Sequence, residues 1–275
     1  MPTAVLTLVA LTAFAANSIL CRAALGGGAI DAASFSTVRL LSGAVTLALL
    51  VQLGGRRLAG SWWSAGYLFL YAVPFSFAYQ SLATGTGALI LFGAVQATML
   101  IAAVLAGERP GVLQWVGLAT ALGGLVYLVL PGVSAPEPIG SALMAVAGVG
   151  WGVYSLRGRG ASDPLAETAG NFVRTLPMVA VVSAAALSDV HITAPGAVLA
   201  VSSGAVASGV GYAIWYAALG GLTATIAATV QLSVPVLAAI GGVLFMAEAI
   251  TARLLLASLL ILGGVALALL GRARG

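Results

Sequence analysis

The stretch VQATMLIAAVLAGE, residues 95–108, returns as VQLSVPVLAAIGGVLFMAE, residues 230–248. Each copy opens on Val-Gln, closes on Glu, and is followed by a Gly-Gly pair that starts 15 residues after the Glu. The Gln-to-Glu spacing grows from 12 to 17 residues, so the second copy is longer by about one helical turn. Weaker matches upstream pair Tyr79 with Tyr216 and Arg39 with Arg174. A duplicated apolar unit is typical of transporters, whose substrate site lies between the two copies.

The composition places the chain in a lipid bilayer. It is 61% hydrophobic and 7% charged, with a mean hydropathy of +1.13, whereas soluble proteins carry about 25% charged residues. The single cysteine, Cys21, excludes an internal disulfide, and no thiolate cluster is available for a metal or a cofactor. Ten apolar stretches have the length that a helix needs to cross a membrane: 3–20, 34–53, 62–81, 86–106, 112–130, 139–156, 164–187, 196–218, 223–246 and 252–270.

The arginines predict the orientation of these helices. If the N-terminus is cytoplasmic, the loops on that side hold seven arginines, namely Arg56, Arg57, Arg109, Arg157, Arg159, Arg272 and Arg274, and the opposite loops hold two, Arg22 and Arg253. This bias places both termini on the cytoplasmic side of the membrane. Because the arginines are spread over many loops, no face is suited to nucleic acid.

The predicted fold is all-α and integral to the membrane, with ten transmembrane helices in two five-helix repeats. Five is an odd number, so the second repeat enters the membrane from the opposite side and the repeats are inverted. We expect the first repeat over 1–131, a proline-containing linker over 132–138 and the second repeat over 139–275. Asp163 is expected to cap the helix that begins at Pro164.

Three amides stand within apolar helices, where an unpaired amide facing lipid is costly. Gln96 and Gln231 occupy matching places near the middle of their helices, and Asn17 lies in the first helix. They should therefore face the protein interior. They either line a substrate cavity or bond to a neighbouring helix.

Aromatic residues form a second set of candidates. Trp151 and Tyr154 share one helical face, as do Tyr212, Trp215 and Tyr216. They form either a cavity wall or an aromatic belt at the cytoplasmic interface. The counterparts in the first repeat, Phe14, Asn17 and Tyr79, lie toward the outside and would supply an outer wall. Trp62 and Trp63 are predicted to be interface anchors.

Charged residues inside helices are the third set. Arg39 is near enough to a helix end to extend its side chain to water in a structural role, whereas Arg174 meets either a substrate carboxylate or Glu167. Glu108 and Glu248 stand at helix ends beside Arg109 and near Arg253, where we expect stabilising turns. No carboxylate lies in the middle of a helix, which disfavours exchange of protons for lipophilic cations.

Several of these residues carry a family resemblance. Trp151-Gly152-x-Tyr154, the Glu108 and Glu248 turns and the Gly-Gly pairs resemble the drug/metabolite transporter superfamily in its ten-helix, EamA-type branch. The first repeat departs from the pattern, with Phe14-Ala15 where a Trp-Gly pair is expected. The resemblance implies alternating access through a central cavity and a place in the bacterial inner membrane. Within the superfamily the chain is similar to bacterial exporters of amino acids, aromatic ones included.

The sequence leaves other functions open. Efflux of drugs or of other small metabolites is the alternative within the same superfamily. An intramembrane enzyme is disfavoured because the single histidine, His191, lies in a loop and no zinc-binding HExxH motif is present. A membrane scaffold would leave the amides and arginines within helices unexplained. The predicted partners are a small-molecule substrate and the bilayer, without a cofactor or a metal, and a monomer is compatible with this plan.

Overall fold

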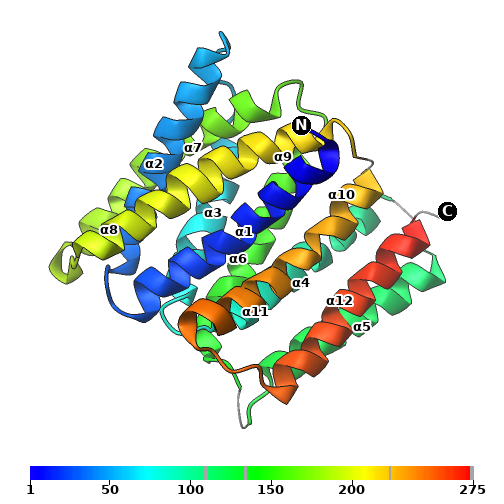
Figure 1. The fold of residues 1–275 in the computed structure, drawn as a ribbon. Helices are drawn as coiled ribbons and strands as arrows, with labels where there is room; N and C mark the ends of the chain where they lie inside the picture. The colour runs from blue at the N-terminus through cyan, green and yellow to red at the C-terminus, as the bar shows by residue number, and fades with distance from the viewer. Residues whose placement is uncertain (108–110, 133–134, 223, 273–275) are drawn as a thin grey trace.

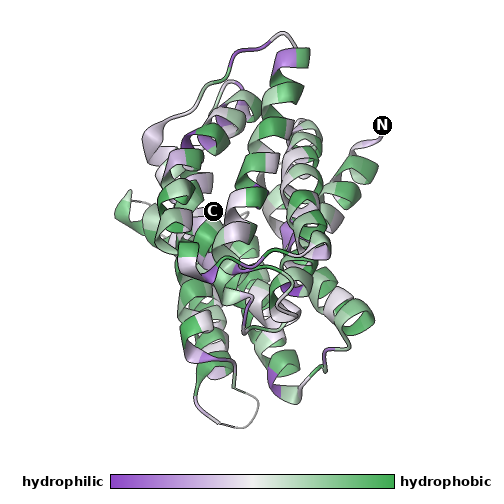
Figure 2. Ribbon diagram, turned by 90° about the vertical axis from the view of Figure 1, so that its left-hand side faces the viewer, coloured by the Kyte–Doolittle hydropathy of each residue, from purple (hydrophilic) through white to green (hydrophobic). Residues whose placement is uncertain are grey.

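The computed structural model describes residues 1–107, 111–132, 135–222 and 224–272, and this part of the chain is helical apart from its loops (Figure 1). Apolar residues cover most of each helix (Figure 2). The first half of the chain forms α1 (Thr3–Gly26), α2 (Ala32–Leu53), α3 (Trp62–Ala78), α4 (Thr84–Leu105) and α5 (Val112–Val129). The second half forms α6 (Pro138–Arg157), α7 (Pro164–Ala185), η1 (Leu187–Asp189), α8 (Ala194–Val201), η2 (Ser202–Val210), α9 (Gly211–Leu219), α10 (Ala224–Gln231), α11 (Ser233–Met246) and α12 (Ala252–Arg272).

Eight of the described helical segments are long and apolar enough to cross a membrane. The two remaining candidates are α3, which has 17 residues, and α7, which carries Glu167, Asn171 and Arg174 along its length. The structure therefore supports an all-helical, multi-pass membrane protein. Ten crossings and an inverted repeat stay predictions.

Two of the spans are irregular. The segment Ala194–Leu219 consists of α8, η2 and α9, and η2 is a π-helix, a form with i→i+5 bonding that is rare and frequent at functional sites. The span that ends at Met246 is interrupted at Leu232, between α10 and α11. Pro235 follows three residues later and has no N–H to donate to the carbonyl of Gln231, which explains the break at this point.

The helices pack in defined pairs. Helix α5 lies along α12, α3 along α6 and α2 along α7, while α1 contacts α9 and α11, and α4 contacts α6 and α11. Glycine permits the closest approaches. A Cβ on Gly148 of α6 would lie 2.6 Å from the carbonyl oxygen of Leu91 in α4, and a Cβ on Gly117 of α5 would lie 2.5 Å from that of Gly264 in α12.

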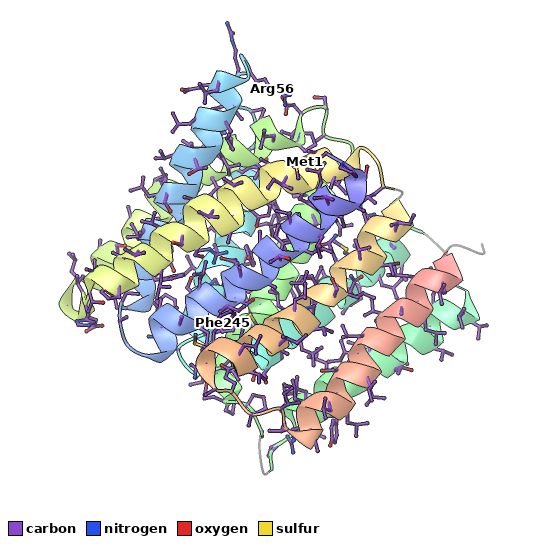
Figure 3. All side chains as sticks on the ribbon, in the orientation of Figure 1. Met1, Arg56 and Phe245 are labelled. Atoms are coloured by element: carbon purple, nitrogen blue, oxygen red, sulfur yellow. The ribbon has the colours of Figure 1, made fainter. Side chains whose placement is uncertain are left out.

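Polar contacts gather at the two ends of the bundle. Met1 and Arg56 lie at one end and Phe245 at the other (Figure 3). At the first end Asp163 caps α7, as predicted, and pairs with Arg56 at 3.3 Å. At the second end, Glu248 pairs with Arg22 at 3.4 Å.

Glu248 stands just after α11, where a stabilising turn is predicted, and its ion-pair partner is Arg22 rather than the nearby Arg253. Arg253 instead donates to the carbonyls of Leu128 and Leu130, because α12 lies directly against α5. The corresponding prediction for Glu108 and Arg109 falls outside the described residues.

Candidate functional site

A cavity of about 620 Å³ runs from the middle of the bundle to the end at which α6 ends and α7 begins. It reaches the surface at the loop after α6, where Gly158, Arg159 and Gly160 are exposed. Helices from both halves of the chain line it, chiefly through Phe92, Gln96, Met99, Trp151, Tyr154, Glu167, Thr168, Asn171, Tyr212, Trp215, Tyr216 and Gln231. Six of the lining residues are aromatic, and amide, hydroxyl and carboxylate groups also line the cavity.

A ladder of stacked rings forms one wall. The ring of Trp151 stacks on Tyr154 at 5.5 Å and on Tyr212 at 5.6 Å between centroids, with interplanar angles of 29° and 20°. Tyr212 continues to Tyr216 at 6.5 Å. The two helical faces found in the sequence thus meet in one surface, which suits a flat, apolar solute.

Two tyrosine hydroxyls of this ladder form hydrogen bonds with helix α7. Tyr154 donates to the Thr168 hydroxyl at 3.2 Å, and the Thr168 and Tyr216 hydroxyls lie 2.6 Å apart. The Asn171 amide donates to the Tyr154 hydroxyl at 3.3 Å and accepts from the backbone N–H of Ser61. These bonds hold both tyrosines within the protein, and Tyr154 is buried.

Both glutamines line the cavity. Gln231 stands at the break between α10 and α11, and its amide donates to the Ala227 carbonyl of its own helix at 3.3 Å. Gln96 lines the main cavity and also a groove of about 90 Å³ between α4, α5 and α12. Both side chains are half-buried and border space within the protein.

Beyond Trp151 and Gln231 the cavity narrows to a space of about 30 Å³, which we call the end chamber. Phe14, Asn17, Tyr71, Phe75, Phe92, Ser208 and Tyr212 are among the residues that line it. The Asn17 amide accepts from the Ser203 hydroxyl at 2.5 Å and donates to the Tyr71 hydroxyl at 3.3 Å. Asn17 thus joins α1, η2 and α3 at the closed end of the site.

Arg39 lies directly behind the end chamber. Its side chain does not extend to water as predicted, because 2% of the residue is exposed and the guanidinium turns inward. Nη2 donates to the Tyr71 hydroxyl at 3.0 Å, and the guanidinium carbon is 4.8 Å from the ring centroid of Phe75 and 5.3 Å from that of Tyr71. The two rings of α3 attract the cation and keep it inside the bundle.

Seven of the nine predicted site residues therefore line the cavity or its end chamber, and Tyr79 and Arg174 do not. Tyr79 is buried, and its hydroxyl donates to the Thr84 carbonyl at 3.2 Å. Arg174 donates to the carbonyls of Ala59 and Gly170 at 2.7 and 2.9 Å, and so fixes the segment before α3. Glu167, the alternative partner for Arg174, lines the open part of the cavity.

Sequence reasoning did not single out several lining residues. Thr168 and Asn171 are spaced i, i+3 on α7, and this polar pair within a membrane-length helix was the available signal. Tyr71 and Ser208 gave no such signal, since Tyr71 is one of many aromatic residues in its helix and Ser208 is one of three serines in its segment. In the described part of the chain, no group of three or more His, Cys, Asp or Glu residues is placed to hold a metal ion.

Comparisons with known proteins bear on the family and the fold of the chain. Residues 138–270 match the model of the EamA-like transporter family. The chain is 52% identical to the uncharacterized protein PA1977 of Pseudomonas aeruginosa, over 98% of this chain and 96% of that protein. A protein of known crystal structure shares the fold with a TM-score of 0.68 at 24% identity, over 96% of this chain and 97% of that one.

Proposed function

Because this chain belongs to the EamA-like transporter family, we propose that it exports small metabolites across the bacterial inner membrane. Amino acids, aromatic ones included, are the proposed substrate class, and alternating access through the central cavity is the proposed mechanism. In this proposal both termini are cytoplasmic, so the open end of the cavity faces the cytoplasm. The chain then takes its substrate from inside the cell.

The observation that carries the proposal is the cavity itself. It is open at one end and narrows to the end chamber at the other, and its walls combine a ladder of rings with amides from both halves of the chain. Apolar walls with a few placed polar groups are typical of small-molecule sites. An inward-open state of an alternating-access transporter has this shape.

The helix pairing supports a two-fold relation between the halves. Pairs α2–α7, α4–α11 and α5–α12 each join an element to its counterpart five spans later. The contact of α3 with α6 corresponds to that of α1 with the span α8–η2–α9. Such a pairing is what two inverted five-helix repeats would produce, and it puts the cavity between them.

One observation favours the alternative, efflux of cationic drugs. Glu167 lies among the cavity-lining residues at the open end, where it would attract a cation. The two functions differ in the charge of the solute, and so one screen separates them.

The test is a counterflow screen in proteoliposomes with radiolabelled amino acids, nucleosides and lipophilic cations. We expect accumulation of one or more aromatic or apolar amino acids, abolished by Trp151→Ala and retained by Trp62→Ala, whose indole is exposed and does not line the cavity. Accumulation of cations alone would contradict amino-acid export and support efflux of cationic drugs. If the folded parent protein accumulates none of these solutes, a transport role is rejected.

A further inference from the structure

Two buried polar atoms at the closed end of the cavity have no hydrogen-bond partner in the described part of the chain: Nη1 of Arg39 and the hydroxyl of Ser208. Each residue is 2% exposed. Buried donors are nearly always paired in native proteins, so an unpaired set beside a cavity indicates a missing acceptor.

The charge of Arg39 is also unbalanced. The ion pairs of the described residues are Arg22–Glu248 and Arg56–Asp163, and neither involves Arg39. A cation at membrane depth is costly and normally has a counter-charge. The rings of Tyr71 and Phe75 offset part of that cost, and neither ring carries the negative charge that would complete the balance.

The Tyr71 hydroxyl connects Arg39 to the cavity by a hydrogen bond. It accepts from Arg39 Nη2 at 3.0 Å and from the Asn17 amide at 3.3 Å, and so its own proton is left to donate. Tyr71 lines the end chamber, and Arg39 lies behind it. An anionic acceptor in the chamber would receive the Tyr71 proton and the field of the guanidinium together.

The π-helix η2 supplies the second unpaired donor, the hydroxyl of Ser208. Ser203 and Ser208 are five residues apart, which in an α-helix of 3.6 residues per turn would separate them by about 140° around the axis. The i→i+5 bonding of a π-helix brings them toward one face. Ser203 consequently reaches Asn17 while Ser208 lines the end chamber.

We propose that the end chamber is an anion subsite and that it takes the carboxylate of a substrate whose apolar body lies on the Trp151–Tyr212 ladder. The inference rests on the proposed transport function and names its substrate class: aromatic or apolar carboxylates, with or without an ammonium group. The chamber, at about 30 Å³, exceeds the roughly 10–15 Å³ that a single water requires, and so it has room for a carboxylate group. Amines and amides of the same shape lack the charge that Arg39 requires.

Direct binding tests this subsite, measured by calorimetry on detergent-purified protein with three probes of one shape: phenylalanine, 3-phenylpropionate and phenylalanine amide. We expect the two carboxylates to bind at least about tenfold more tightly than the amide. Tyr71→Phe and Ser208→Ala should each weaken the carboxylates by about tenfold and leave the amide unchanged. Tyr79→Phe is the matched control, since it removes a buried tyrosine hydroxyl that does not line the chamber, and its affinities should equal those of the parent.

Arg39→Lys and Arg39→Met separate charge from packing. The lysine variant should retain a preference for carboxylate over amide, and the methionine variant, if it folds, should lose it. Equal affinity for the three probes in the parent protein, or equal losses for carboxylate and amide in Tyr71→Phe, would overturn the subsite. Carboxylate-selective binding without counterflow would refute the transport proposal and leave the subsite standing, so the two failures are distinguishable.

Discussion

Neutralising Glu248 should open the closed end of the cavity. Its carboxylate accepts from the backbone N–H of Thr84 at 3.0 and 2.8 Å and from the Thr84 hydroxyl at 3.1 Å, and it pairs with Arg22 at 3.4 Å. Arg22 in turn donates to the carbonyls of Tyr79 and Gln80. One carboxylate thus ties the loop after α11 to the last turn of α1 and the first turn of α4.

The magnitude follows from which of these contacts a glutamine preserves. Glu248→Gln keeps one oxygen that accepts from Thr84 and loses the charge, so the hydrogen bonds change from charged to neutral. That change weakens them by about 1–2 kcal/mol in total. The ion pair adds less, because both side chains are partly exposed and screened by solvent. A change of about 1.4 kcal/mol shifts the equilibrium toward the state open at this end by about tenfold.

Cys21 provides the assay, because it is the single thiol of the chain, is fully buried and precedes Arg22. The rate of its modification by a membrane-impermeant maleimide should rise about tenfold in Glu248→Gln. Asp189→Asn is the control: it removes a carboxylate at the same end whose contact is with Ser188, and it should leave the rate unchanged. Equal rates for Glu248→Gln and the parent would refute the reasoning.

Three further predictions follow from the site and the ends of the bundle. Trp151→Ala should weaken substrate binding by about 1–3 kcal/mol in calorimetry, the scale for losing an aromatic contact and the area it buries, whereas Trp63→Ala, an exposed position, should bind like the parent. Reporter fusions at residue 275 and within 132–138 should report cytoplasm and exterior respectively, and both on one side would contradict the inverted repeats. Partial burial raises the pKa of Asp31, but hydrogen bonds from Ser34, His191 and Ala33 outweigh it and lower the pKa below 3.8. The stability Asp31 contributes is therefore present above its ordinary pKa and lost as the pH falls through the lowered one, so Asp31→Asn should flatten this part of an acid-unfolding curve.

Sequence reasoning predicted the helices and several of the cavity-lining residues. Both depend on the free-energy cost of placing polar groups in hydrocarbon and on helical periodicity. Apolar runs of membrane length gave bounds close to those observed, as for 34–53 against α2 and 112–130 against α5. The penalty for an amide in lipid turned Gln96 and Gln231 inward, and helical periodicity put Trp151 and Tyr154 on one face. These features depend on the chain's own spacing and not on which helix lies next to it.

The features that sequence reasoning missed depend on neighbouring helices. Arg39 is seven residues from Ala32, the first residue of α2, and so is near enough to a helix end to reach water. Only the position of Tyr71 and Phe75 on α3 explains why it turns inward. Arg174, its counterpart in the duplicated segment, meets backbone carbonyls instead, because Ala59 and Gly170 lie within its reach. The matching positions of the two arginines in the duplicated segments therefore did not predict matching partners.

The two halves share a helix plan and divide the chemistry of the site unequally. The first half supplies the buried cation, Arg39, and the tyrosine that presents its charge to the cavity. The second half supplies both irregular spans, with the π-helix that turns Ser208 inward and the break that places Gln231 at the cavity wall. Regular helices bury their backbone polar groups in internal bonds, so irregular ones in a membrane must lie against protein or a cavity. The unequal division sets the direction in which a substrate lies: its anionic end faces the half with Arg39, at the closed end, and its apolar body extends along the ring ladder toward the opening.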